Sequence, residues 1–95
     1  MSPYTLWEEY LPIGIVMMVN TSNCSFSTTP TYFTSVAGID QVWNLAGFSC
    51  IYSATQTSFS VYPRHSVIPL GTTSAQLMTS ATAYQWNLNW LGIIE

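Results

Sequence analysis

The segment at residues 84–94, YQWNLNWLGII, constrains the fold most strongly, because large apolar side chains alternate along it with polar ones. In an extended chain, successive side chains point to opposite faces of a sheet. The pattern therefore predicts a half-buried β-strand with one face on a core and one face toward solvent. The apolar face contains Trp86, Leu88 and Trp90, and the polar face contains Gln85, Asn87 and Asn89.

Two more alternating segments lie within residues 47–62, GFSCIYSATQTSFSVY, on either side of the small polar stretch ATQT. The period of two on both sides of this stretch predicts a β-hairpin, around which the rest of the chain is arranged. The stretch contains neither Gly nor an Asn-Gly pair, so we expect a loop of about four or five residues and not a tight two-residue turn.

Residues 13–20, IGIVMMVN, are apolar and rich in β-branched side chains on both faces. This pattern predicts a strand that is covered by the opposite sheet on one side and by another chain on the other. Residues 31–37, TYFTSVA, resume the alternation and predict a further strand. Residues 67–82 have few large side chains and predict a variable loop.

The strand segments are separated by turns, and no convincing amphipathic helix accompanies them. This organisation predicts an all-β fold, a small six-stranded antiparallel β-sandwich, with a barrel as the alternative. The chain of 95 residues has room for one domain. We divide it into an N-terminal arm at residues 1–12, which packs against the body or a neighbouring subunit or else is a disordered tail, and a sandwich at residues 13–95.

Charged residues make up only 5% of the chain, the net charge is -3, and Lys and Arg together occur once. Proteins that bind nucleic acid present clusters of Lys and Arg to the phosphates, so nucleic acid is excluded as a partner. The longest apolar run, residues 11–19, is about half of the roughly 20 residues that a membrane-spanning helix needs, so we expect no membrane insertion. Solubility then depends on hydroxyl and amide groups, and such a surface suits self-association.

Ionisable side chains are too few to indicate a catalytic or metal site, so we expect no enzymatic activity and no cofactor. The adjacent Glu8 and Glu9 would point to different sides of a strand, which does not suit paired carboxylates. A nucleophile pair of Cys50 and His65 is formally possible, but no nucleophile motif surrounds either residue. A disulfide between Cys24 and Cys50 and two free, partly buried thiols are both open.

Arg64 and His65 combine a bidentate donor with an imidazole, just after Tyr62 at the end of the predicted hairpin. Binding groups gather at loop ends on a rigid β scaffold. With Asp40 nearby, these residues would suit a neutral polyol, because sugars are held by polar groups and by an aromatic face against their C–H side. A solvated turn is the other interpretation of the same residues.

Four motifs follow one another in order within residues 26–95. They are TPTYFTSVAGID at residues 29–40, IYSATQTSF at 51–59, YPRHS at 62–66 and YQWNLNWLGIIE at 84–95. Together they resemble the H-type lectin family, which binds galactose and N-acetylgalactosamine, and similar patterns occur in phage tail-fibre tip domains.

This resemblance implies a six-stranded antiparallel sandwich that forms trimers, sometimes stacked as hexamers, with sugars in clefts between subunits. By position, His65 would contact the sugar and Arg64 would stand beside it, and we expect Tyr62 and Asp40 to supply an apolar wall and an acceptor. Cys50 occupies a position where some members have an Arg that reaches across the subunit boundary. The acidic residue of the family's first strand has no certain counterpart here.

We therefore expect an oligomeric lectin at an extracellular location or on the surface of a virion or cell. A structural or assembly module, such as a fibre tip or filament subunit without sugar binding, is the alternative. In either case we expect a closed homotrimer or hexamer with residues 13–19 and the aromatics near Trp7 at the subunit contacts, because an isolated domain would expose a large apolar patch.

Overall fold

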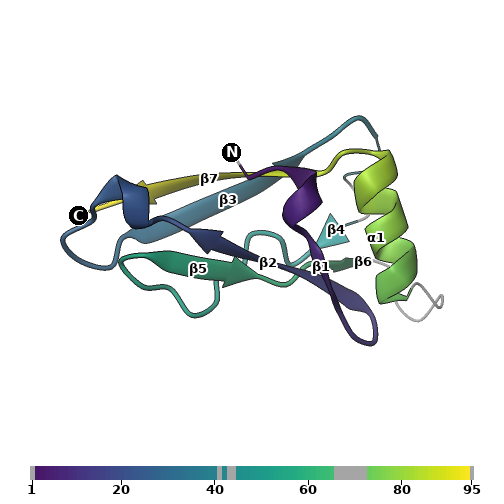
Figure 1. Ribbon diagram of the computed structural model, residues 1–95, viewed down its shortest axis with the longest axis horizontal. Coiled ribbons are helices and arrows are strands. Elements are labelled where there is room, and N and C mark those ends of the chain that lie inside the picture. Colours follow the sequence, from purple (N-terminus) through teal and green to yellow (C-terminus); the bar gives the residue numbers. More distant parts are fainter. Residues whose placement is uncertain (1, 41, 43–44, 66–72, 95) are drawn as a thin grey trace.

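Two antiparallel sheets stack face to face, and a short helix lies at one end of the stack (Figure 1). The computed structural model describes residues 2–40, 42, 45–65 and 73–94. The predicted all-β, sandwich-like fold is confirmed. The smaller sheet consists of β3 (Thr31–Ala37) and β7 (Asn87–Ile93), and the larger one of β1 (Glu8–Tyr10), β2 (Gly14–Asn20), β4 (Leu45–Ala46), β5 (Ser58–Val61) and β6 (Arg64–His65).

Strand β2 is the centre of the larger sheet and is paired along both of its edges. Strand β1 pairs with one edge, and β5 and β6 pair with the other. Gly14 lies opposite Arg64, and the amide of Ile15 donates a hydrogen bond to the carbonyl of Pro63 at 3.0 Å. Strands β5 and β6 therefore form one continuous partner for β2, and β4 lies beyond β6.

The predicted strand at residues 13–20 is confirmed as β2, but its own chain covers most of both faces. Ile15 and Met17 are fully buried between the sheets. Val16, on the other face, is only 9% exposed, whereas Met18 is 71% exposed. A second chain is therefore not needed to bury Val16, and Met18 alone leaves a large apolar side chain of this strand in solvent.

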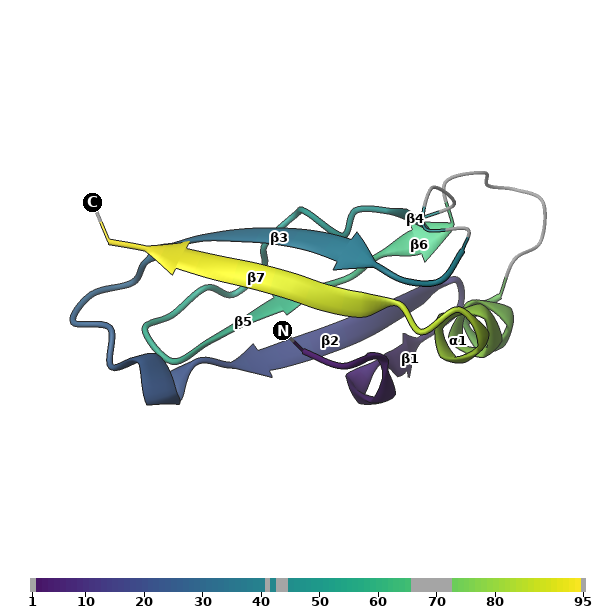
Figure 2. The ribbon, with the colours of Figure 1, turned by 90° about the horizontal axis from the view of Figure 1, so that it is seen from above.

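Strands β3 and β7 have the faces that their alternation predicts. Tyr32 and Leu88 are buried against the larger sheet. Phe33 lies directly opposite Leu91 on the outer face, where both side chains are about half exposed. Figure 2 shows the two strands lying side by side along the long axis of the molecule. This outer face consequently carries large apolar groups without a cover from the described chain.

The prediction of a variable loop at residues 67–82 is wrong from residue 74 onward, where helix α1 (Ser74–Ala83) is formed. A capping box begins the helix: the hydroxyl oxygen of Thr73 accepts a hydrogen bond from the amide of Gln76, and the side chain of Gln76 accepts one from the amide of Thr73. These bonds satisfy amides that would otherwise have no partner in the first turn. The earlier part of the predicted loop, residues 67–72, lies outside the described residues.

Helix α1 closes one end of the sandwich. Leu77 and Ala81 lie four residues apart, on the same side of the helix, and are buried in the core. The hydroxyl of Ser74 donates a hydrogen bond to the carbonyl of Tyr10 at 2.9 Å. The helix thus fastens the end of the hairpin between β1 and β2.

The N-terminal arm packs against the body, as one of its interpretations predicts. It contains the short helix η1 (Tyr4–Leu6) and then Trp7, which is 3% exposed. The indole N–H of Trp7 donates to the carbonyl of Trp86 at 2.7 Å. Its own chain therefore buries Trp7, and a neighbouring subunit is not needed to cover it. Trp86 in turn lies so close to Gly38 that a Cβ on Gly38 would come within 2.7 Å of its ring.

The predicted hairpin at residues 47–62 forms only in part. Its second arm is β5, but its first arm is held by a single bridge, with hydrogen bonds of 2.8 and 2.9 Å between the main chains of Tyr52 and Ser60. The hydroxyl oxygen of Thr55 accepts hydrogen bonds from the amides of Thr57 and Ser58, so a side chain closes the turn where no glycine is present.

Both cysteines are free and exposed, so the alternative of a disulfide does not hold. Cys24 ends the short helix η2 (Ser22–Cys24), and Cys50 follows a turn after β4. The placement of Cys50 in the middle of a strand and the partial burial of the two thiols were wrong expectations. Because the first arm of the hairpin is mostly irregular, Cys50 is not part of a strand that pairs with β5.

We predict that Trp86→Ala leaves little folded protein. Truncation of a buried Trp costs about 3–5 kcal/mol, and a small domain has only about 5–15 kcal/mol to lose. Trp90→Ala should cost less, because Trp90 is only half-buried. Ile39→Ala, at a side chain that is 70% exposed, is the control and should unfold near the parent. Urea unfolding followed by circular dichroism measures all three, and a parental midpoint for Trp86→Ala would contradict this assignment of the core.

Candidate functional site

Arg64 and His65 form β6, where the pleat of the sheet points them to opposite faces. Arg64 lies opposite Ala46, and His65 lies opposite Leu45, which is 5% exposed and part of the core. The pleat therefore directs His65 toward the layer between the sheets and Arg64 toward the outer face. Arg64 is exposed and His65 is half-buried. The structure does not bring these two predicted residues together on one face.

Tyr62 lies on the outer face of the larger sheet, because its chain neighbours Val61 and Pro63 are both buried in the core. Its ring contacts two other tyrosines. The ring centroids of Tyr62 and Tyr10 are 4.8 Å apart, and those of Tyr62 and Tyr52 are 5.1 Å apart, both in edge-to-face arrangements. Such pairs stabilise each other by about 0.5–1.5 kcal/mol beyond the area they bury. The predicted aromatic wall is thus part of a larger aromatic cluster.

Gly14 lies between Tyr10 and Arg64 in the larger sheet. It lies opposite Tyr10 in β1 and opposite Arg64 in β6. A Cβ on Gly14 would be 3.4 Å from the carbonyl oxygen of Pro63 and 3.8 Å from Cδ2 of Tyr10. These are ordinary van der Waals distances, so it is the pairing of Gly14 with both strands that places Tyr10 and Arg64 near one another on the outer face.

Asp40 comes from the segment after β3, at the end of the smaller sheet, and is exposed. Its main-chain carbonyl accepts a hydrogen bond from the indole N–H of Trp86 at 2.8 Å. This bond fixes the backbone of Asp40 to the core. Asp40 therefore follows a strand of the smaller sheet, whereas Tyr62 lies between two strands of the larger one.

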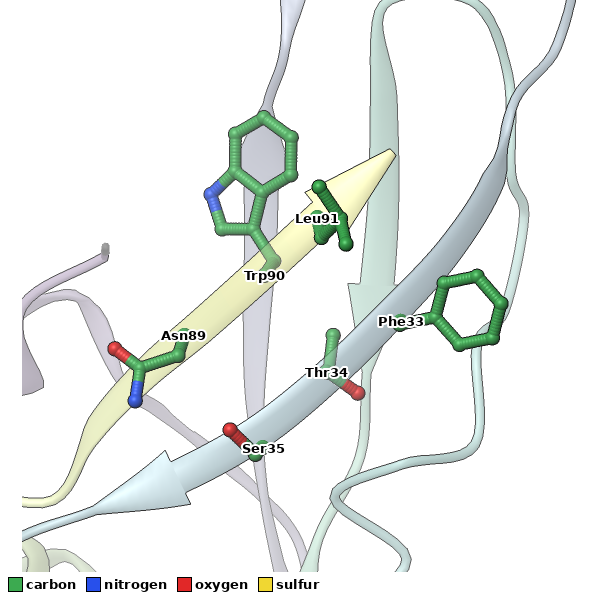
Figure 3. A pocket seen from close by; sticks show the side chains of 6 residues that line it. All are labelled: Phe33, Thr34, Ser35, Asn89, Trp90 and Leu91. Atoms are coloured by element: carbon green, nitrogen blue, oxygen red, sulfur yellow. The ribbon is translucent and has the colours of Figure 1, made fainter. Parts of the chain in front are cut away.

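Three shallow surface hollows are lined by other residues than the predicted ones. One of about 270 Å³ lies on the smaller sheet, with Phe33 and Leu91 from neighbouring positions of β3 and β7 on its walls (Figure 3). One of about 520 Å³ lies beside Met18 and Ser58, and one of about 470 Å³ lies beside Met78 on α1. None of these three hollows contains a predicted site residue.

The described residues contain no group of three or more His, Cys, Asp or Glu side chains that could hold a metal ion. In the same residues, every buried side-chain nitrogen or oxygen has a hydrogen-bond partner. Within the described part of the chain, no helix has the length and apolar character required to cross a membrane.

Tyr10 and Tyr52 are the surface residues that sequence reasoning missed. Tyr52 lies opposite Ser60, so Tyr62, two residues further along, is its diagonal neighbour on the same face. The predicted hairpin indicated two facing arms but not this register. Tyr10 lay in an arm without a clean period. Its position depends on the pairing of β1 with β2, which the sequence of the arm did not indicate.

Comparison of the chain with protein-family models, with curated proteins and with solved structures finds no match.

Proposed function

We propose that the protein is a non-enzymatic lectin that binds glycans of the galactose and N-acetylgalactosamine class as a homo-oligomer. The observation that carries this proposal is the position of Arg64, an exposed guanidinium on the same face as the contacting rings of Tyr62 and Tyr10. Its neighbours on this face are mainly uncharged.

A neutral sugar needs two kinds of partner, and this face provides both. The guanidinium presents N–H donors in a fixed fork, which can bond two neighbouring hydroxyl oxygens. The rings of Tyr62 and Tyr10 offer apolar surface to the C–H side of a sugar and hydroxyl groups at their tips. The sheet holds all three residues in place, so binding requires little ordering of the backbone.

The resemblance to the H-type lectin family supports the class of ligand. In that family the position of His65 contacts the sugar, whereas the pleat of β6 directs His65 away from Arg64. We therefore place the sugar on the outer face beside Arg64 and Tyr62. His65 and Asp40 contribute only if the sugar instead binds around the end of β6, and mutation distinguishes these positions.

The proposed lectin is an oligomer. We place the contact between its subunits on the smaller sheet and not on β2. Phe33 and Leu91 are 53% and 55% exposed on the outer face of that sheet, and Ile93 on the same face is 43% exposed. The described strands that carry them have no charged residue. An uncharged apolar face also favours the second candidate, a structural or assembly module such as a fibre tip or filament subunit. A glycan ligand would place the lectin outside the cell or on a virion or cell surface.

We predict that Arg64→Ala weakens binding of galactose or N-acetylgalactosamine by roughly ten- to a hundredfold. Hydrogen bonds to a charged group contribute about 1.5–3 kcal/mol, and 1.4 kcal/mol corresponds to about tenfold in affinity. The melting temperature should hardly change, because Arg64 is exposed. A glycan array identifies the best sugar, and titration calorimetry then measures the two proteins.

Two further variants locate the sugar. Glu9→Ala, on the opposite face of β1 from Tyr10, is the control and should bind as the parent does. If His65→Ala also binds as the parent does, the sugar lies on the outer face. Equal losses for Arg64→Ala and His65→Ala would move it to the end of β6, and unaltered affinity in both would reject this site.

We also predict a trimer or hexamer in solution. Size exclusion coupled to light scattering measures the mass, and a 10.6 kDa monomer at micromolar concentration would contradict the prediction. The double variant Phe33→Ser and Leu91→Ser should produce smaller species, because it removes apolar contact area. Met18→Ser, on the larger sheet, is the matched control. If only this control dissociates the oligomer, the contact lies on β2 after all.

A further inference from the structure

Tyr10, Tyr62 and Tyr52 form a line across the outer face of the larger sheet, which we call the tyrosine row. Tyr62 is its centre, with ring centroids 4.8 Å from Tyr10 and 5.1 Å from Tyr52. The two outer rings belong to residues that are 56% and 51% exposed, respectively. The row is thus anchored in the middle and presents aromatic surface at both ends.

The tyrosine row crosses the strands because each ring comes from a different part of the sheet. Tyr10 ends β1, Tyr62 lies between β5 and β6, and Tyr52 is bridged to Ser60 in β5 by two main-chain hydrogen bonds. Backbone pairing therefore sets the spacing of the rings. Tyrosine has only two side-chain torsions, so a ligand that covers these rings orders little that is not already ordered.

Two charged groups of opposite sign flank the tyrosine row. Arg64 lies opposite Gly14, which in turn lies opposite Tyr10. Glu8 precedes Tyr10 by two residues in β1, so it shares the outer face, and it lies opposite Val16. Arg64 and Glu8 are both exposed. Beside the rings, this face therefore offers a strong donor and a strong acceptor.

We propose that the tyrosine row binds a linear, uncharged glycan of several sugar units that crosses the strands. Sugar rings pack on the exposed rings of Tyr10 and Tyr52, on either side of Tyr62, whose ring stands at 64° and 84° to theirs, while Arg64 and Glu8 bond to sugar hydroxyls. This inference rests on the proposed function and deepens it, because it extends the site from one sugar beside Arg64 to a chain of sugars that reaches Tyr52.

A proline-rich peptide is the strongest competing ligand, since such segments also bind in grooves lined by aromatic side chains. Proline has no backbone N–H, so a proline-rich segment would cover Glu8 with few donors for its carboxylate. A sugar hydroxyl both donates and accepts, and so it satisfies Glu8 and Arg64 alike. Nucleic acid is a poor candidate, because the chain has a single Lys or Arg side chain to meet phosphates.

Titration calorimetry tests the proposal, with galactose and linear β1,4-linked galacto-oligosaccharides of increasing length added to the full chain. Affinity should rise by about two- to tenfold for each added sugar that reaches a tyrosine. Tyr52→Ala should remove the gain of the longest chains and leave the affinity for galactose unchanged, whereas Tyr52→Phe should keep the gain. Ile39→Ala is the matched control, because Ile39 is 70% exposed but follows β3 of the other sheet, outside the proposed subunit contact.

The outcomes separate the extended site from the function on which it rests. If neither galactose nor any oligosaccharide binds, the proposed function fails together with the extended site. If galactose binds and longer chains bring no gain, or if the gain survives Tyr52→Ala, only the extended site is overturned. Binding of decaproline that is lost in Tyr52→Ala, without any gain for oligosaccharides, would assign the row to a proline-rich partner.

Discussion

The structure depends on Trp86, which is 1% exposed between the two sheets. Its indole N–H donates to the carbonyl of Asp40 at 2.8 Å, and its own carbonyl accepts from the indole N–H of Trp7 at 2.7 Å. Its amide donates to the carbonyl of Ala81, in helix α1, at 3.1 Å. One residue therefore joins the end of β3, the N-terminal arm and the helix. The packing of the apolar core and the hydrogen bonds that hold these three segments therefore depend on the same residue.

The elements that could be predicted from the sequence are those in which one face is apolar and the other polar. Strands β3 and β7 are of this kind, and the burial of Tyr32 and Leu88 follows directly from their alternation. Strand β2 was predictable as a strand, because its β-branched run resists helix formation. The burial of Val16 on its outer face was not predictable in the same way, since it depends on how β2 pairs with its neighbours.

The periodicity of apolar residues in the sequence predicted neither helix α1 nor the tyrosine row. The helix buries Leu77 and Ala81 among many small side chains, so its apolar stripe is faint in the sequence. The usable signal was the spacing of Thr73 and Gln76, which is that of a capping box. The tyrosine row depends on the register of three pairings, and a slip of one residue in any of them would turn a ring to the other face.

Strand β3 gives the smaller sheet an open edge. Among the described residues it pairs with β7 and with no other strand, and its sequence, TYFTSVA, contains neither a charge nor a proline. Natural sheets commonly protect such edges with lysine, proline or a bulge. Here a neighbouring segment approaches the middle of the strand, where the hydroxyl of Thr34 donates to the carbonyl of Phe48 at 2.7 Å. This bond comes from a side chain and leaves the main-chain groups of the edge unused by a strand, so the edge of β3 is a place where another copy can add a strand, as in the growth of fibrils.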